Sequence, residues 1–166
     1  ITAGDSFSFT VNVQCSDPET GECANAALTF DLPDPLEFTE GQFSISPAVA
    51  TGSITGKKLT ITFNDGKLVA GQLVAIAVKA MLPSTASANL DGDTVKASIE
   101  VAADSADTVS DAVAVTLNIP TVLAAHTTKS VSPTATQPAL AGRRLTYTIT
   151  GSNDSNSSVD SLTIAE

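Results

Sequence analysis

The sequence predicts an all-β protein with an immunoglobulin-like antiparallel β-sandwich fold. Three observations support this prediction. Apolar and polar residues alternate with a period of two along most of the chain, turn-forming stretches such as Asn-Asp-Gly separate the alternating segments, and no stretch shows a helical period. Alternation buries one face of a strand and exposes the other, as two packed antiparallel sheets require.

The first alternating segment, SFSFTVNV at residues 6–13, places Phe and Val on one face and Ser, Thr and Asn on the other. A shorter segment, AALTFDL at residues 26–32, places Leu28 and Phe30 on one face, and QFSIS at residues 42–46 is weaker. Four more segments before Pro120 alternate in the same way: residues 58–63, 72–80, 94–101 and 111–119. About seven strands with turns between them are typical of one sandwich.

The chain then begins to repeat itself. Ala3-Gly4 recurs as Ala141-Gly142, and the apolar positions of residues 7–11 recur 138 residues later as Leu145, Tyr147 and Ile149. ALTF at 27–30 recurs as SLTI at 161–164, after a loop that is four residues shorter. We therefore expect tandem modules: residues 1–120 form one module that lacks its first strand, and residues 121–166 form a junction and the N-terminal part of a second module.

These segments resemble a family of bacterial cell-surface repeats, which are Ig-like modules of unknown function found in tandem in secreted and wall-attached proteins. The matching residues are Gly4 and Gly142 before the first long strand, Asp31-Leu32-Pro33 at the end of a strand, and Lys129 in the Thr-Lys pair that opens a copy. The resemblance implies stalks and adhesive layers at the cell surface or cell wall, and no catalytic activity.

Charge limits the range of partners. The net charge is −10, and residues 1–120 carry all of it, with 15 acidic and 5 basic residues. Such a surface repels phosphate backbones and anionic lipid headgroups, so we expect no nucleic-acid partner. The chain contains no apolar run of about 18 residues, so we expect no membrane insertion.

Cys15 and Cys23, the two cysteines, flank a loop rich in Asp, Glu, Pro and Gly. A zinc site needs about four nitrogen or sulfur ligands, and the single histidine, His126, lies far away in the sequence. The Cys-x-x-Cys spacing of redox proteins is absent. We therefore predict a Cys15–Cys23 disulfide, which favours an oxidising, extracellular setting.

Two further sites are weaker hypotheses. Asp91 and Asp93 resemble half of a calcium loop, to which Asp104, Asp107 and Asp111 could add ligands, but Asp-Gly-Asp is also an ordinary hairpin turn. Calcium is the only cofactor that the sequence suggests. An intramolecular isopeptide bond needs a buried lysine beside a carboxyl or carboxamide group. Lys79 and Lys96 point away from the core by alternation, which leaves Lys129 as the candidate.

The sequence offers no catalytic constellation, because its acids are scattered and its one histidine has no paired nucleophile. The leading interpretation is a non-enzymatic spacer or stalk repeat of a secreted or cell-wall-attached bacterial surface protein, with neighbouring modules of the same polypeptide as its partners. The alternative is an adhesive module for a host protein or a carbohydrate. The chain has only seven aromatic residues, most of them on inward positions, which disfavours a sugar-binding platform.

Overall fold

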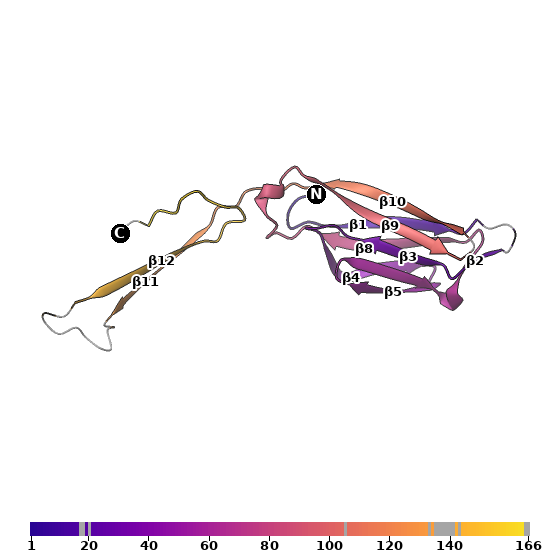
Figure 1. The fold of residues 1–166 in the computed structure, drawn as a ribbon, viewed down its shortest axis with the longest axis horizontal. Helices are drawn as coiled ribbons and strands as arrows, with labels where there is room; N and C mark the ends of the chain where they lie inside the picture. Colours follow the sequence, from indigo (N-terminus) through magenta and orange to yellow (C-terminus); the bar gives the residue numbers. More distant parts are fainter. Residues whose placement is uncertain are drawn as a thin grey trace. The chain divides into compact units, whose positions relative to one another are not determined.

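The computed structural model describes residues 1–16, 19, 21–104, 106–132, 134, 142 and 144–164. The chain divides into two compact units (Figure 1). Unit 1 comprises Ile1–Ala86 and Leu90–Ile119, and unit 2 comprises Ser87–Asn89 and Pro120–Glu166.

Unit 1 is a sandwich of two antiparallel sheets, which confirms the predicted fold class. The three-stranded sheet has the order β1 (Ser6–Gln14), β8 (Leu73–Met81), β4 (Glu37–Ser46). The five-stranded sheet has the order β10 (Ala106–Thr116), β9 (Thr94–Ala103), β3 (Ala27–Asp31), β6 (Lys58–Phe63), β5 (Ala50–Thr55). Non-consecutive neighbours such as β1 and β8 show that long-range pairing builds the three-stranded sheet, whereas the five-stranded sheet combines such pairing with the consecutive pairs β5–β6 and β9–β10.

The core lies between the two sheets and consists of the residues on the inward positions of the alternation. The three-stranded sheet contributes Phe9, Val13, Val74, Ile76, Val78 and Ala80, and the five-stranded sheet contributes Leu28, Phe30, Leu59, Ile61, Phe63 and Ala97. Every buried residue in the described part of the chain is apolar. Period-two alternation therefore predicts the buried face of each of these strands correctly.

Smaller elements lie between the longer strands. A two-stranded sheet pairs β2 (Glu22–Ala24) with β7 (Lys67–Val69), and two short 3-10 turns, η1 (Asn64–Gly66) and η2 (Ala88–Leu90), connect longer strands. None of the helical segments in the described residues is long and apolar enough to cross a bilayer.

The structure differs from the sequence prediction at the margins of the sheets. β5 was not predicted, and β10 begins at Ala106 instead of residue 111 and ends at Thr116 instead of residue 119. Both strands lie at the outer ends of the five-stranded sheet, and β10 is exposed along nearly its whole length. A strand that buries little of either face has no need of strict alternation, so its sequence carries a weak signal.

Unit 2 contains one antiparallel pair, β11 (Ala125–Ser132) with β12 (Thr146–Asn153), and none of its described residues is fully buried. Residues 161–164, which repeat part of β3 in sequence, do not form a strand. In unit 1, β3 is held between β6 and β9, and unit 2 has no such neighbours among its described residues. Leu162 and Ile164 instead pack closely over Gly151 of β12.

Candidate functional site: the disulfide corner and the open edge of the sandwich

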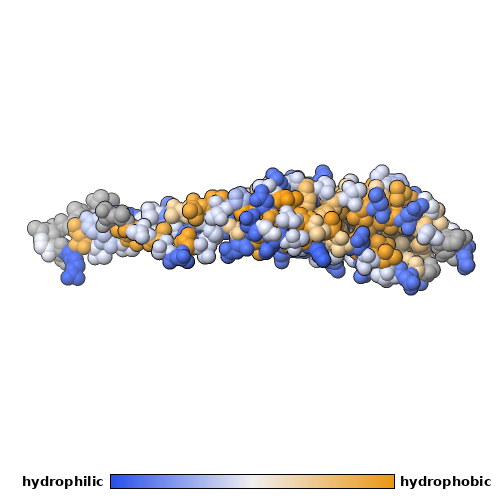
Figure 2. All heavy atoms as spheres, turned by 90° about the horizontal axis from the view of Figure 1, so that it is seen from above, coloured by the Kyte–Doolittle hydropathy of each residue, from blue (hydrophilic) through white to orange (hydrophobic). Residues whose placement is uncertain are grey.

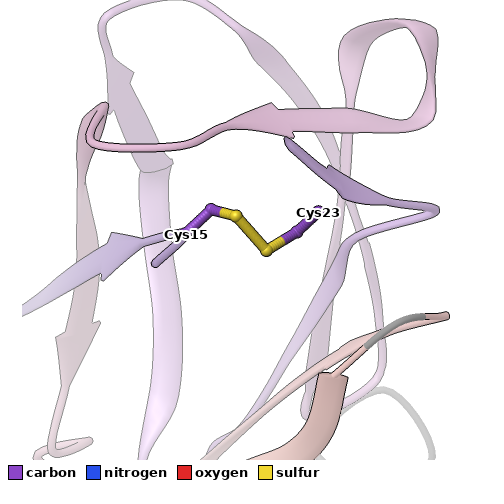
Figure 3. The surroundings of a disulfide bond; sticks show 2 residues. All are labelled: Cys15 and Cys23. Carbon is purple, nitrogen blue, oxygen red and sulfur yellow. A yellow bond between two sulfur atoms is a disulfide. The ribbon is translucent and has the colours of Figure 1, made fainter. Parts of the chain in front are cut away.

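The structure contains the predicted disulfide. Cys15 directly follows β1 and Cys23 lies in β2, and the bond joins them across a loop with a sequence separation of 8 (Figure 3). Both cysteines are buried. By loop-closure entropy, a bond that closes a loop of this length stabilises the fold by about 2.5 kcal/mol. The bond ties the end of the three-stranded sheet to the small β2–β7 sheet.

Hydrogen bonds and an ion pair support this corner. The Gly71 N–H donates to the carbonyl oxygen of Cys15 at 2.9 Å, and Cys15 forms an isolated parallel bridge with Ala70. On the neighbouring strands, Lys67 Nζ lies 2.8 Å from Glu22 Oε1. The hydrogen bond and charge of Glu22 raise the pKa of Lys67 above its usual value. The corner is thus fixed by one covalent bond and by several polar contacts.

A groove opens between the two sheets along the side of unit 1 where β1 and β10 lie. Each of these strands ends its sheet, with one neighbour among the described strands. The groove has a volume of about 960 Å³, and β1 lines one wall while β9 and β10 line the other. Val109 and Val113 of β10 line it and are 65% and 47% exposed. Figure 2 looks onto unit 1 from the side of β10, and apolar residues (orange) reach the surface there.

Asp91 and Asp93 stabilise a turn. Asp91 Oδ1 accepts a hydrogen bond from the Ile119 N–H at 2.7 Å, and the carbonyl oxygen of Asp93 accepts one from the Leu117 N–H at 2.8 Å. These contacts hold the chain after β10 against the turn that precedes β9.

The additional calcium ligands do not join this turn. Asp104 follows the other end of β9, where its Oδ2 accepts a hydrogen bond from Asn25 Nδ2 at 2.6 Å, and Asp107 and Asp111 lie in β10. The condition under which they could add ligands, a loop that folds near Asp91, is not met, because ten residues of extended β9 separate Asp91 from Asp104. No group of three or more His, Cys, Asp or Glu side chains that could hold a metal occurs among the described residues. Calcium binding at Asp91 and Asp93 stays a prediction.

The lysine candidates lie on strands. Lys129, in β11, places its Nζ 4.9 Å from the ring centroid of Tyr147, a cation–π geometry. Lys79 and Lys96 are exposed, on the outward faces of β8 and β9. His126 is exposed in β11. An isopeptide bond at Lys129 stays a prediction.

Sequence reasoning did not identify the groove. The expectation that residues 1–120 form a module without its first strand, which rested on the partial repeat after Pro120, could have pointed to an open place between the sheets. A sandwich that lacks one strand leaves its two sheets open where that strand would lie.

No known protein family and no curated protein matches the chain. Solved structures do match. The major pilin subunit BcpA of Bacillus cereus aligns with a TM-score of 0.55 at 10% identity, over 94% of this chain and 51% of the pilin. Domains D2 and D3 of the major pilin SpaD of Corynebacterium diphtheriae align with a TM-score of 0.50 at 13% identity, over 81% of this chain and 53% of the two-domain structure. The chain therefore spans about half the length of the pilin structures that it matches, and at this identity the similarity shows a shared all-β fold.

Proposed function

We propose that the chain is part of a non-enzymatic structural protein of a bacterial cell surface or cell wall, in which repeated β-sandwich modules act as a spacer or stalk. Three features support this proposal. Unit 1 has an apolar core without buried polar residues in its described part, its loop is closed by a disulfide, and its fold is shared with pilin subunits. Disulfides persist in oxidising, extracellular settings.

The observation that carries the proposal is the correspondence between β1 and β12 in sequence and in the glycine that precedes each. These strands repeat one sequence pattern 138 residues apart, and each follows a glycine with a left-handed backbone, Gly4 with φ 94° and Gly142 with φ 82°. A side chain disfavours this conformation, so the same turn is encoded twice before the same strand. We infer that unit 2 is the beginning of a second module and that modules follow one another along the chain.

Backbone hydrogen bonds hold the two chain ends of unit 1 together, in an arrangement that is expected to resist a pulling force. Thr2 forms a parallel bridge with Asn118, with hydrogen bonds from the Asn118 N–H to the Ile1 carbonyl oxygen (2.8 Å) and from the Ala3 N–H to the Asn118 carbonyl oxygen (3.0 Å). Tension that draws the two ends apart along these segments shears both hydrogen bonds at once. Bonds that must break together resist force better than bonds that break in sequence.

Force spectroscopy of the chain, tethered at its two ends, tests this proposal. We expect unit 1 to unfold in one cooperative step. Replacement of Ala3 by proline should lower the unfolding force, because it removes the N–H that donates to the Asn118 carbonyl oxygen. Replacement of the exposed Thr51 on β5 by alanine is the matched control and should leave the force unchanged. The proposal fails if unit 1 extends gradually without a force peak.

The adhesive alternative is tested in parallel on arrays of glycans and host matrix proteins. Saturable binding that is lost on substitution in the loop at residues 34–36 would favour an adhesive role. A spacer is expected to bind none of the arrayed ligands.

A further inference from the structure

We propose that the groove between β1 and β10 holds one additional β-strand, which runs antiparallel to β1, inserts alternate side chains between the two sheets and is followed by a short connection to Ile1. The proposal deepens the tandem-module proposal, on which it rests for the identity of the strand. The occupant is an extended segment of the same type as residues 121–132, supplied by the polypeptide in front of Ile1.

The groove has the shape that a strand requires. Its walls run along residues 8–16 of β1 and its extension and along residues 106–113 of β10. About eight extended residues span roughly 27 Å, and β11 contains 8 residues. Along one wall β1 has an unpaired edge among the described strands, and the exposed Val109 and Val113 lie on the other. An added strand would supply backbone partners to this edge and cover the valines.

Ile1 and Thr2 already show the direction of the missing strand. The parallel bridge between Thr2 and Asn118 means that Ile1 and Thr2 run in the same direction as the end of β10. The backbone then turns at Gly4 and returns along β1. A segment that precedes Ile1 and keeps this direction therefore enters the groove, parallel to β10 and antiparallel to β1.

The pairing of β11 with β12 in unit 2 gives the expected register of the added strand against β1. The two strands pair antiparallel, with Val131 opposite Tyr147, Lys129 opposite Ile149 and Thr127 opposite Gly151. At the 138-residue offset, these three β12 residues correspond to Phe9, Val11 and Val13. Phe9 and Val13 are buried on the inner face of β1. Residues directly opposite each other in a ladder share a face, so the counterparts of Val131, Lys129 and Thr127 would point into the groove.

The charge of the groove is complementary to this strand. Its described lining residues include Glu19, Asp107 and Asp111 and contain no lysine or arginine. Asp111 lies opposite Ile99 in the β9–β10 ladder, so it belongs to the inner face that Val109 and Val113 share. Asp111 Oδ1 accepts a hydrogen bond from the Ala112 N–H at 2.7 Å, but a carboxylate on an inner face is costly to bury without a cationic partner. The counterpart of Lys129, directed inward from the added strand, would provide that partner.

The added strand also changes where the chain enters the module. Ile1 and Asn118 are hydrogen-bonded neighbours, so unit 1 begins and ends at the same end of the sandwich. An antiparallel strand that covers β1 would begin near Gln14, at the opposite end, roughly 30 Å away. Entry and exit would then lie at opposite ends, which is the arrangement that an end-to-end stalk requires.

The test is a chain extended at its N-terminus by a copy of residues 121–138, placed directly before Ile1, because the 138-residue offset puts this copy in register. We expect the melting temperature of unit 1 to rise by at least about 5 °C. We also expect hydrogen exchange of the β1 and β10 amides to slow by at least about tenfold. Val131→Asp in the grafted copy, an inward position, should abolish both effects. Ser130→Asp, the adjacent outward position, should preserve them.

Two results would overturn the proposal. The first is an extended chain with unchanged melting temperature and unchanged exchange in β1 and β10. The second is an unextended chain that forms a dimer in sedimentation, with β1 and β10 protected in the dimer, because a second copy would then fill the groove. Both readouts measure protection of the groove rather than load bearing or ligand binding. Failure here is therefore distinguishable from failure of the spacer proposal.

Discussion

The rings of Phe9 and Phe30 lie 5.3 Å apart between centroids, with their planes tilted by 53°. Phe9 belongs to the three-stranded sheet and Phe30 to the five-stranded sheet, so this contact joins the two layers of the sandwich beside the groove. Phe9 is also in edge-to-face contact with Phe7, at 5.2 Å. This small aromatic cluster is the point at which the core approaches the open edge.

Phe30→Ala should destabilise unit 1 by about 3–5 kcal/mol, because Phe30 is 2% exposed and its removal leaves a cavity between the sheets. Chemical denaturation of the two proteins measures the difference. Phe38→Ala is the control: Phe38 is only partly buried, in β4, and its loss should cost clearly less. Equal losses for the two variants would contradict this account of the core.

Reduction of the Cys15–Cys23 disulfide should lower the free energy of unfolding by about 2.5 kcal/mol. In force spectroscopy it should also lengthen the unfolded chain. The locked loop contributes the 5.9 Å between the two Cα atoms, whereas its eight freed residue steps span up to roughly 26–29 Å. Unfolding of the double variant Cys15→Ala, Cys23→Ala should therefore release about 20 Å more length than the oxidised protein does. An unchanged length would mean that the bond does not form in solution.

Asp91→Ala should destabilise unit 1 by about 1–2 kcal/mol, because the partly buried Ile119 N–H loses the acceptor that lies 2.7 Å away. Asp91→Asn keeps an oxygen in the same place and should retain most of the stability. The same pair of variants tests the calcium hypothesis in thermal melts with calcium and with a chelator. If calcium raises the melting temperature of the parent protein but not that of Asp91→Asn, the carboxylate serves as a metal ligand rather than as a hydrogen-bond acceptor alone.

The Lys67–Glu22 ion pair should make stability depend on alkaline pH. The pKa of Lys67 is raised above 10.5 in the folded protein by its hydrogen bond to Glu22. A raised pKa of this kind contributes stability that is complete below pH 10.5 and is lost as the pH rises through the higher folded pKa. The effect should be small, because the pair is exposed. Glu22→Gln should flatten this part of the stability profile between pH 9 and 12, and an identical profile would exclude the coupling.

Much of unit 1 could be predicted from individual segments. Alternation in residues 6–13 and 58–63 identified both the strands and their buried faces, because a half-buried strand must place an apolar residue at every second position. The disulfide followed from the count and spacing of the cysteines. The polar edge strand β5 and the first half of β10 could not be predicted in this way, since their side chains remain largely in contact with solvent.

The sequence by itself determined the all-β class, the inward and outward faces of the main strands, the Cys15–Cys23 pairing and the partial repeat after Pro120. These features depend on local chemistry: the alternation of apolar and polar side chains, the turn-forming residues, and the number and spacing of the cysteines. Only the tertiary structure decided which strands are neighbours, that Asp91 binds the Ile119 N–H, and that β1 and β10 border an open groove. Strand order and open edges depend on contacts between residues far apart in the chain, and no local pattern encodes the partner of a strand.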